Sequence, residues 1–359
     1  MITERTFTKD WLLTVNKQLN WNRLETQLKN LEKAVAAFHL LELLADTKMS
    51  FIFKGGTSLL LLLQRIFRLS VDIDIIVEDA IDYIDVFSLI CSKSKLFTHF
   101  EQQERERDVM HGTKHYKFFY TPFADASEES YILLDLYEST NPYAKVLELE
   151  LVSSILDTEG KNVLIRVPDV DSILGDKLTA FAPDTIGISL TAEPGYRPKR
   201  IEVLKQLFDV GNLFDYSVNI ESIRNTHYAI AMYEIEKRGV EITVADVLKD
   251  SARHAYIIGH GGKVDKPIYD TIAKGFKDFN KFVADLSFDE NQAILAAAKV
   301  AYLVSVLLLG DEVLEKYGSD TIMDTWNIQD EPYVNFNDYK YSNPEAFFYW
   351  YKALTNKLP

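Results

Sequence analysis

Two short segments bring together residue types that suit phosphate and a divalent metal ion. Residues 54–58 read Lys-Gly-Gly-Thr-Ser, and residues 68–75 read Arg-Leu-Ser-Val-Asp-Ile-Asp-Ile. Glycines at a turn leave backbone N–H groups accessible to phosphate oxygens, and paired carboxylates suit a hard divalent cation. The ordered combination of both segments indicates chemistry on a phosphorylated substrate more strongly than either segment alone.

The two carboxylates of the second segment share one side of an expected strand. Because side chains alternate along a strand, Asp72 and Asp74 project from one face, while Val71, Ile73 and Ile75 project from the other. Two like charges cost free energy here unless a cation or a basic side chain neutralises them. Two magnesium ions about 3.5–4 Å apart would do so and would stabilise the oxygens of a phosphoryl transfer. A solvated edge or an isolated structural cation site is the alternative.

Gly55 and Gly56 follow the apolar run 49–53 and precede an expected helix at 58–67. This order predicts a strand that turns sharply into a helix, whose first N–H groups can hold phosphates. A Gly-Gly pair after a strand can also be only a turn.

The order strand, Gly-Gly-Thr, helix, Arg-x-Ser-x-Asp-x-Asp resembles the signature of the AbiEii/AbiGii-type nucleotidyltransferases. These are toxins of bacterial abortive-infection and type IV toxin–antitoxin systems within the polymerase-β-like superfamily. The resemblance covers about residues 54–215 and implies that Asp72 and Asp74 bind Mg²⁺ or Mn²⁺. It also implies a set of residues that bind a nucleoside triphosphate: Gly55, Gly56, Thr57, Ser58, Arg68 and Ser70.

The family also has a lysine early in the first helix after the sheet and an aspartate in a later helix. Lys177 and Asp209 stand in these places, within residues 176–181 and 205–210. Gln206 follows the basic residue of the second segment, where the family commonly has an acidic residue. By resemblance, Lys177 neutralises the triphosphate and Asp209 is a catalytic carboxylate.

Helix periodicity gives these two positions structural alternatives. Lys177 lies on an inward stripe, where a lysine either extends to the surface or meets a buried anion, and Asp171 or Ser172 would cap its helix. Lys205 and Asp209 lie four residues apart, off the apolar stripe of their own helix. An exposed ion pair explains that spacing as well as a catalytic role does.

A single carboxylate, Asp135, interrupts the apolar strand expected at residues 132–137. A buried aspartate requires a partner. Superfamily members have a third carboxylate on the strand next to the Asp-x-Asp strand. The resemblance therefore implies that Asp135 helps to bind the metal and, like Asp209, could act as the general base. A hydrogen-bonded aspartate at a strand end is the structural alternative.

The histidines do not form a recognisable zinc motif. His111 and His115 lie four residues apart, and His254 and His260 lie near glycine-rich sequence, but no acidic or cysteine partner completes a set. We expect all four at the surface or in loops. Cys91 is the only cysteine, which excludes an internal disulfide framework.

The net charge of −15 argues against a general nucleic-acid binder, because affinity for phosphate backbones needs a surplus of lysine and arginine. The stretch 183–200 contains Arg197, Lys199 and Arg200 and is either a local basic patch or a solvated connection. The N-terminus has neither the basic nor the apolar region of an export signal, so we expect a cytoplasmic location.

Periodicity predicts an α/β (α+β) fold followed by helices. Residues 8–46 read as two helices, and the apolar run 293–309, which contains Lys299, reads as a buried helix because it is short for a membrane span. Strands are expected at 49–54, 70–77, 115–120, 130–137, 144–153 and 162–167, with a helix at 82–92. We expect a nucleotidyltransferase core with N-terminal helices at 1–168, and an α-helical domain at 169–359 that completes the nucleotide and acceptor cleft.

The predicted function is metal-dependent transfer of a nucleoside monophosphate to an acceptor, with release of pyrophosphate. What the resemblance implies for the acceptor is RNA, including the 3′ end of tRNA, with growth arrest as the outcome and an antitoxin as partner. A protein side chain or a small hydroxylated molecule is the alternative acceptor. A nucleotide-binding regulatory protein is the alternative from another class, although the intact pair Asp72 and Asp74 argues against it.

Overall fold

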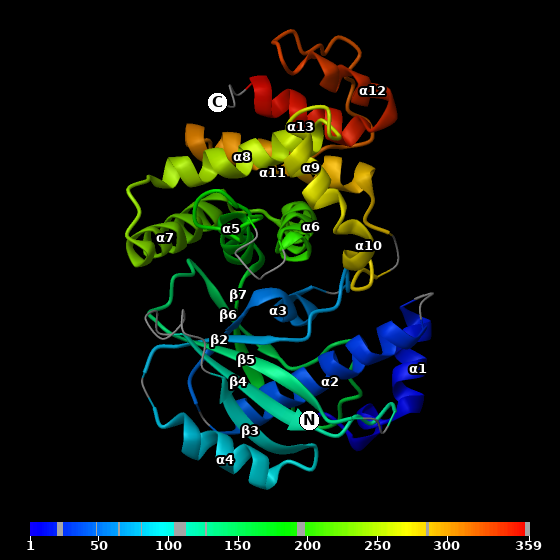
Figure 1. The fold of residues 1–359 in the computed structure, drawn as a ribbon, viewed down its shortest axis with the longest axis vertical. Coiled ribbons are helices and arrows are strands. Elements are labelled where there is room, and N and C mark those ends of the chain that lie inside the picture. The colour runs from blue at the N-terminus through cyan, green and yellow to red at the C-terminus, as the bar shows by residue number, and fades with distance from the viewer. Residues whose placement is uncertain are drawn as a thin grey trace. The chain divides into compact units, whose positions relative to one another are not determined.

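The computed structural model describes residues 1–19, 24–47, 49–63, 65–79, 81–103, 113–125, 128–191, 198–284 and 287–355. The chain divides into two compact units (Figure 1). Unit 1 comprises Met1–Asn141, Lys145–Asp169 and Lys281–Leu286, and unit 2 comprises Pro142–Ala144, Val170–Asn280 and Ser287–Pro359. Two residues considered in the sequence, His111 and Arg197, lie outside the described residues.

Unit 1 is built on a five-stranded mixed sheet with the order β1-β2-β5-β4-β3. β2 and β5 run parallel, and the other neighbours run antiparallel. Because parallel neighbours need a long crossover, the chain forms a helix and two strands before it returns as β5. The strands are β1 (Ile52–Lys54), β2 (Ile73–Val77), β3 (Phe97–Gln103), β4 (Thr113–Tyr120) and β5 (Ser130–Glu138).

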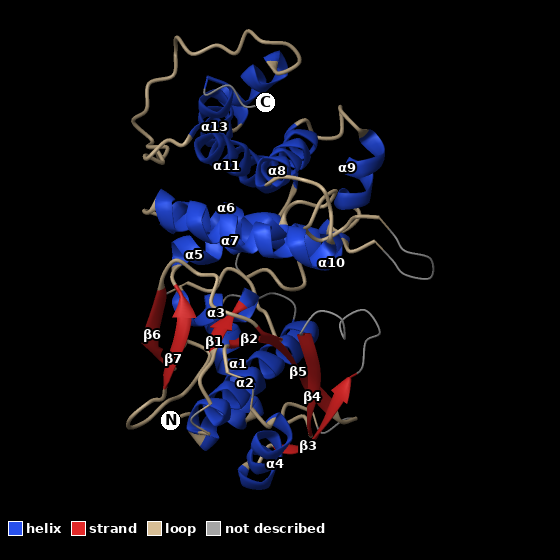
Figure 2. Cartoon of the chain, turned by 90° about the vertical axis from the view of Figure 1, so that its left-hand side faces the viewer, coloured by secondary structure: helices blue, strands red, loops and turns tan. Residues whose placement is uncertain are grey.

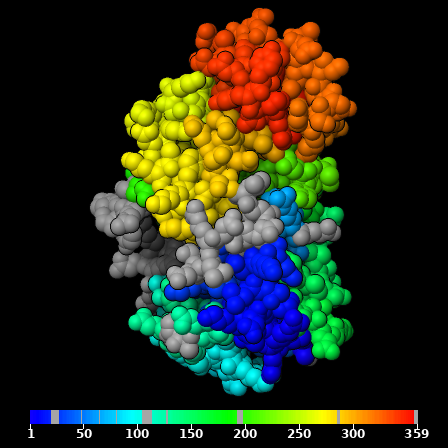
Figure 3. Space-filling model, turned by 90° about the vertical axis from the view of Figure 1, so that its right-hand side faces the viewer, coloured from blue at the N-terminus to red at the C-terminus, as the bar shows by residue number. Residues whose placement is uncertain are grey.

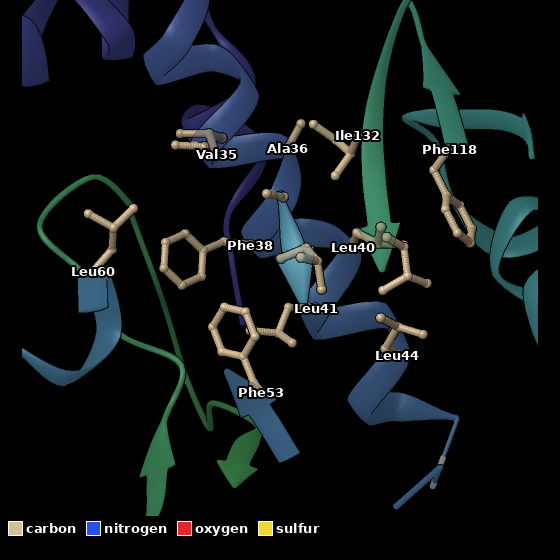
Figure 4. Close-up of a cluster of buried hydrophobic side chains, with 14 of the residues drawn as sticks. Val35, Ala36, Phe38, Leu40, Leu41, Leu44, Phe53, Leu60, Phe118 and Ile132 are labelled. Carbon is tan, nitrogen blue, oxygen red and sulfur yellow. The ribbon is translucent and has the colours of Figure 1, made fainter. Parts of the chain in front are cut away.

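One face of this sheet is apolar because the strand sequences alternate. On β5, Ile132, Leu134 and Leu136 are buried, whereas the two residues between them are only partly buried. Helices α2 (Leu24–Asp46) and α4 (Tyr83–Lys93) pack on the apolar face. Figure 4 shows Phe38 of α2 beside Phe53 of β1. Burial of each such large side chain contributes about 1.5–3 kcal/mol relative to exposure, so this core fixes which face of each strand is polar.

Shorter elements complete unit 1. The 3₁₀ helix η1 (Glu4–Phe7) and α1 (Lys9–Gln18) belong to the N-terminal residues, which are blue on the exterior in Figure 3. Helix α3 (Gly55–Leu62) follows β1 directly, and β6 (Val146–Glu150) and β7 (Leu164–Pro168) form a separate antiparallel pair (Figure 2). The segment around Val283 returns to this unit, where the N–H of Leu69 donates to the carbonyl of Phe282 at 2.8 Å.

All regular elements among the described residues of unit 2 are helices. Helix α11 (Glu290–Leu309) is apolar over most of its circumference, as expected for a helix surrounded by others. Its buried Lys299 forms ion pairs with Asp215 at 2.7 Å and Glu345 at 3.1 Å. The other helices are α5 (Val170–Ala180), α6 (Arg200–Tyr216), α7 (Ile220–Arg238), α8 (Val244–Gly259), α9 (Lys266–Ala273), α10 (Phe276–Phe279), η3 (Val334–Asp338), α12 (Tyr339–Ser342) and α13 (Pro344–Thr355).

Among the described residues, α11 alone is long and apolar enough to cross a membrane by length and composition. Most of its apolar window, 78%, is buried inside the protein. The prediction of a buried helix at residues 293–309 is therefore confirmed.

The predicted fold class is confirmed, since the chain has a mixed sheet with flanking helices followed by further helices. β3 was not predicted, because its polar residues face outward on an edge strand and leave no apolar run. The helix expected at 58–67 begins at Gly55 and ends at Leu62, and the strand expected at 70–77 begins at Ile73. Asp171 does not cap α5: it lies inside the helix and accepts a hydrogen bond from the N–H of Val218 at 2.9 Å.

Candidate active site

A row of four polar residues crosses one face of the sheet in unit 1. Lys54 on β1 lies opposite Asp74 on β2. Asp135 on β5 lies opposite Asp74 on one side and opposite His115 on β4 on the other. Directly opposed residues share a face, so these side chains leave the sheet on the side away from the apolar core. Neighbouring strands lie about 4.8 Å apart, so the row places two carboxylates within reach of one cation.

Both glycines of the first motif lie against polar residues of the second. Gly55 has a φ of +77°, and a Cβ atom there would lie 2.1 Å from Oδ2 of Asp74. A Cβ atom on Gly56 would lie 2.5 Å from a guanidinium nitrogen of Arg68 and 2.9 Å from Oγ of Ser70. A side chain fits at neither position without displacing a neighbour, which explains the need for glycine at both.

The hydroxyl groups after the glycines hold the turn in shape. Oγ1 of Thr57 donates to the carbonyl oxygen of Asp72 at 2.5 Å, and Oγ of Ser58 donates to the carbonyl oxygen of Gly55 at 2.8 Å. Both residues are buried, whereas Asp72, one residue before β2, is exposed. The structure therefore brings the two motifs together through backbone as well as side-chain contacts.

His115 is a site neighbour that the sequence interpretation missed. It was expected at the surface or in a loop, but it lies on β4, and its side chain is only 6% exposed. Its Nδ1 atom lies 2.6 Å from Oδ1 of Asp135. The alternation of β4 places His115 on the face opposite the apolar Tyr116 and Phe118. That alternation is visible in the sequence, but the strand register that brings His115 to Asp135 is not.

A separate charged group lies on the other face at the end of β5. Nζ of Lys114 donates to Oε1 of Glu138 at 2.6 Å, and this hydrogen bond lowers the pKa of Glu138. Burial raises the pKa of Tyr116 and of Tyr83. These shifts arise from packing on the core face and involve none of the residues of the polar row.

Lys177 and Asp209, the later pair of predicted site residues, meet each other in unit 2. Nζ of Lys177 lies 3.1 Å from Oδ2 of Asp209, and the side chains are 8% and 1% exposed. The inward orientation of Lys177 is confirmed, and its anion is a protein carboxylate. The alternative of an exposed Lys205–Asp209 pair is wrong, because α6 buries Asp209.

Unit 2 also contains a second group of residues of metal-binding type. Asp184, Asp250 and His254 place ligand atoms within 4.8 Å of one another. The expectation that His254 is a surface residue without acidic partners is therefore wrong, and His260 is also buried. Oδ2 of Asp250 accepts from the N–H of Asp184 and from Oγ1 of Thr185, each at 2.8 Å. Arg253 forms an ion pair with Asp184. Protein groups therefore hydrogen-bond or pair with both carboxylates, and these contacts connect the turn after α5 to α8.

A family model matches most of the length of the chain. Residues 40–297 match the family model described as nucleotidyl transferase AbiEii toxin, type IV TA system. No curated protein is similar enough to match.

Two solved structures illustrate the similarity at low sequence identity. JHP933 from Helicobacter pylori is 14% identical, with 77% of this chain and 92% of that chain covered and a TM-score of 0.42. MenT4, a nucleotidyltransferase toxin from Mycobacterium tuberculosis, is 17% identical, with 82% and 98% covered and a TM-score of 0.44. The family model, by contrast, spans more than half of the chain, including the glycine turn, the polar row and the Lys177–Asp209 pair. The chain therefore belongs to the AbiEii family of nucleotidyltransferase toxins of type IV toxin–antitoxin systems.

Proposed function

We propose that this nucleotidyltransferase uses a divalent metal ion to transfer a nucleoside monophosphate from a nucleoside triphosphate to RNA. The position of Asp74 supports this proposal most directly, because Asp74 lies between Gly55 and Asp135. One neighbour belongs to a turn that suits phosphate, and the other is a carboxylate that suits a cation. A site for metal-bound triphosphate needs both.

The carboxylates of unit 1 fit Mg²⁺ or Mn²⁺. Asp74 and Asp135 are directly opposed on parallel strands, and Asp72 is exposed two residues before Asp74. Oxygen ligands are those that both ions prefer, and like charges this close favour a bound cation. When bound, the metal supplies positive charge that polarises the phosphate oxygens. We propose Asp72, Asp74 and Asp135 as its ligands.

The triphosphate is proposed to bind at the start of α3. The N-cap residue of α3 is Lys54, whose backbone is extended and whose side chain has no acceptor atom for the N–H groups of the first turn. The N–H groups of a first helical turn have no partner within the helix and favour anions. Arg68 and Ser70, which lie against Gly56, would add a positive charge and a hydroxyl donor.

The proposed reaction is a single displacement at phosphorus. The acceptor hydroxyl oxygen bonds to the α-phosphorus, the bond from that phosphorus to the α–β bridging oxygen breaks, and pyrophosphate leaves. We propose Asp135 as the group that takes the hydroxyl proton, because it lies beside Asp74 on the same face. The role of Lys177 in neutralising the triphosphate, and that of Asp209 as a catalytic carboxylate, stay predictions.

The same sheet face supports RNA as the acceptor. Tyr131 precedes Asp135 by four residues on β5, so the two side chains share a face. Phe119 lies opposite Tyr131, and the ring of His99 stacks on Phe119 with centroids 4.4 Å apart and planes 2° from parallel. Unpaired bases stack on exposed rings of this kind in proteins that bind single-stranded nucleic acid.

Two lysines add positive charge to this aromatic surface. The ammonium groups of Lys33 and Lys117 lie 5.1 and 4.6 Å from the ring centre of Tyr131. Such a local surface would let a chain of net charge −15 bind a single-stranded RNA end without general affinity for nucleic acid. A protein or a small hydroxylated molecule is the alternative acceptor.

The physiological setting follows from the family. Membership of a type IV toxin–antitoxin family implies an antitoxin partner. We propose that the nucleotidyl transfer arrests growth in the cytoplasm unless this antitoxin is present.

One incubation series tests the acceptor and the metal. The purified protein is mixed with Mg²⁺, each α-labelled nucleoside triphosphate in turn, and total cellular RNA. Asp72→Ala tests the proposed ligand, and Asp79→Ala is the matched control, because Asp79 is an exposed aspartate just after β2. We expect label in RNA with the wild type and with Asp79→Ala, and none with Asp72→Ala or after chelation of the metal.

Other outcomes would redirect the proposal. Label on protein would show that the acceptor is a protein and not RNA. Equal labelling by Asp72→Ala and the wild type would exclude the proposed metal site. Nucleotide binding without label in RNA or protein would favour a small-molecule acceptor or a regulatory protein.

A further inference from the structure

We propose that His115 is a positioning residue that orients the carboxylate of Asp135 for metal binding and proton transfer. This inference rests on the proposed function, since it assigns His115 a task through Asp135. The pair spans two neighbouring strands, with the residues directly opposed on β4 and β5. The distance of 2.6 Å between Nδ1 and Oδ1 is short for a hydrogen bond that involves a nitrogen donor.

The hydrogen bond determines which oxygen of Asp135 can bind a metal ion or accept a proton. A carboxylate oxygen accepts, so Nδ1 of His115 donates, and the bond fixes both the plane of the carboxylate and the tautomer of the ring. Oδ2 of Asp135 then becomes the oxygen that can face a cation shared with Asp74. Partners that hold ligating carboxylates in this way tune metal affinity without touching the metal.

The position of the pair favours this role over simple burial of two polar groups. Asp135 lies between His115 on one side and Asp74 on the other, all at one level of the sheet. Its side chain is 16% exposed, whereas that of His115 is 6% exposed, so the histidine lies deeper than the carboxylate it contacts. A rigid donor behind the carboxylate is the arrangement expected of an outer partner.

Two substitutions distinguish the effect of losing the hydrogen bond from the effect of losing the volume of the ring. His115→Leu removes the donor and keeps an apolar side chain of moderate size. His115→Asn keeps an N–H donor near the position of Nδ1. The matched control is His39→Leu, because Nδ1 of His39 also contacts a carboxylate in unit 1, that of Glu42 at 3.3 Å, but on α2 and away from the polar row.

The measurements are Mn²⁺ binding by titration calorimetry without nucleotide, the Mg²⁺ dependence of transfer, and KM and kcat for the nucleoside triphosphate. For His115→Leu we expect Mn²⁺ affinity or kcat to fall about 10–100-fold, with little change in KM. His115→Asn is expected to recover most of the loss, and His39→Leu is expected to bind Mn²⁺ as the wild type does. Circular dichroism of each variant checks that the fold is retained.

Two results would overturn the inference while leaving the proposed function intact. One is wild-type Mn²⁺ affinity and transfer in a folded His115→Leu variant. The other is an equal loss in His115→Asn and His115→Leu, which would show that the donor is not what matters. Failure of the wild-type protein itself to bind Mn²⁺ and to transfer label would instead reject the proposed function.

Discussion

Backbone conformation and a neighbouring carboxylate both limit the side chain at Gly55. Its φ of +77° lies in the left-handed region, where an alanine costs about 1–2 kcal/mol. A Cβ atom would also approach Oδ2 of Asp74 to 2.1 Å. We predict that Gly55→Ala lowers the free energy of unfolding by more than this backbone cost and weakens Mn²⁺ binding, measured by urea denaturation and calorimetry.

Gly160 offers a matched control for Gly55 in the same unit. Its φ is +70°, and a Cβ atom there would have nothing within 4 Å. Gly160→Ala should therefore cost only the backbone term of about 1–2 kcal/mol and leave Mn²⁺ binding unchanged. Equal effects of the two substitutions would contradict a close contact between the turn and Asp74.

The buried pair of Lys177 and Asp209 leads to a prediction about stability. Lys177→Met breaks an ion pair whose carboxylate is 1% exposed, and breaking a buried pair from one side typically costs about 3–5 kcal/mol. The double variant Lys177→Met/Asp209→Leu should regain much of that loss, because both charges of the pair are then removed from the interior together. Urea denaturation of both variants provides the measurement.

The control for that pair is the Lys266–Asp270 pair on α9, which has the same 3.1 Å separation but exposed side chains. Lys266→Met should change stability by less than about 1 kcal/mol. If Lys177→Met were as mild, the ion pair would not be buried as described. If the double variant retained transfer activity, the catalytic roles predicted for both residues would be wrong.

At the scale of single residues, only contacts between residues of short sequence motifs could be predicted from the sequence. Asp72 and Asp74 stand two apart, and Gly55 follows a strand, so their types and spacing are readable. The contacts of Asp135 with His115 and of Lys177 with Asp209 join residues 20 and 32 positions apart on different elements. Strand register and helix packing determine these contacts, and a single sequence does not specify either.

Helices and strands were predicted best where apolar residues recur with a clear helical or strand period. The alternation of β5 and the apolar length of α11 are strong signals, and both elements lie close to their expected positions. β3 is an edge strand with mostly outward polar side chains, so it lacks that signal. Helix α3 ends at Leu62, one residue before the end of its leucine run, and Leu63 is already extended.

Close packing of α7 on α5 produces a pH-dependent stability. A Cβ atom on Gly175 of α5 would lie 2.6 Å from the carbonyl oxygen of Ile223 and 3.0 Å from the backbone nitrogen of His227, so the helix backbones are near each other. His227 is buried there, and burial lowers its pKa from 6.5 to about 4. The folded protein therefore holds this imidazole neutral in a range where the unfolded chain protonates it.

The sign of the effect follows from proton uptake. Between pH 6.5 and about 4 the unfolded state binds a proton at His227 and the folded state does not, so stability falls as pH falls through this window. The full loss is about 3 kcal/mol, and above pH 6.5 the group contributes no pH dependence. We predict that His227→Phe flattens this part of the pH profile of the urea midpoint. His99→Phe, which alters an exposed histidine, should not, and an unchanged slope in His227→Phe would contradict the assignment.

For the whole molecule, composition and pattern were sufficient for fold class but not for the acceptor. A mixed sheet followed by helices follows from the change of period near residue 168, and the structure confirms that class. The net charge of −15 gave no hint of the rings and lysines around Tyr131, because that surface is assembled from α2, β3, β4 and β5. Surface chemistry of this kind depends on which strands are neighbours.

The acidity of the chain as a whole also affects how metal binding must be tested. A molecule of net charge −15 gains stability from any cation that screens its charges. A specific site adds stability that rises with the logarithm of the free metal concentration, about 2.7 kcal/mol when free metal is one hundred times its dissociation constant. We predict that Mg²⁺ raises the urea midpoint of the wild type above that in KCl of equal ionic strength. Asp74→Asn should abolish this difference, and Asp79→Asn, which removes one exposed charge beyond β2, should preserve it. The same gain in Asp74→Asn would mean that Mg²⁺ acts by general screening, and the proposal that Asp72, Asp74 and Asp135 bind the metal would then be rejected.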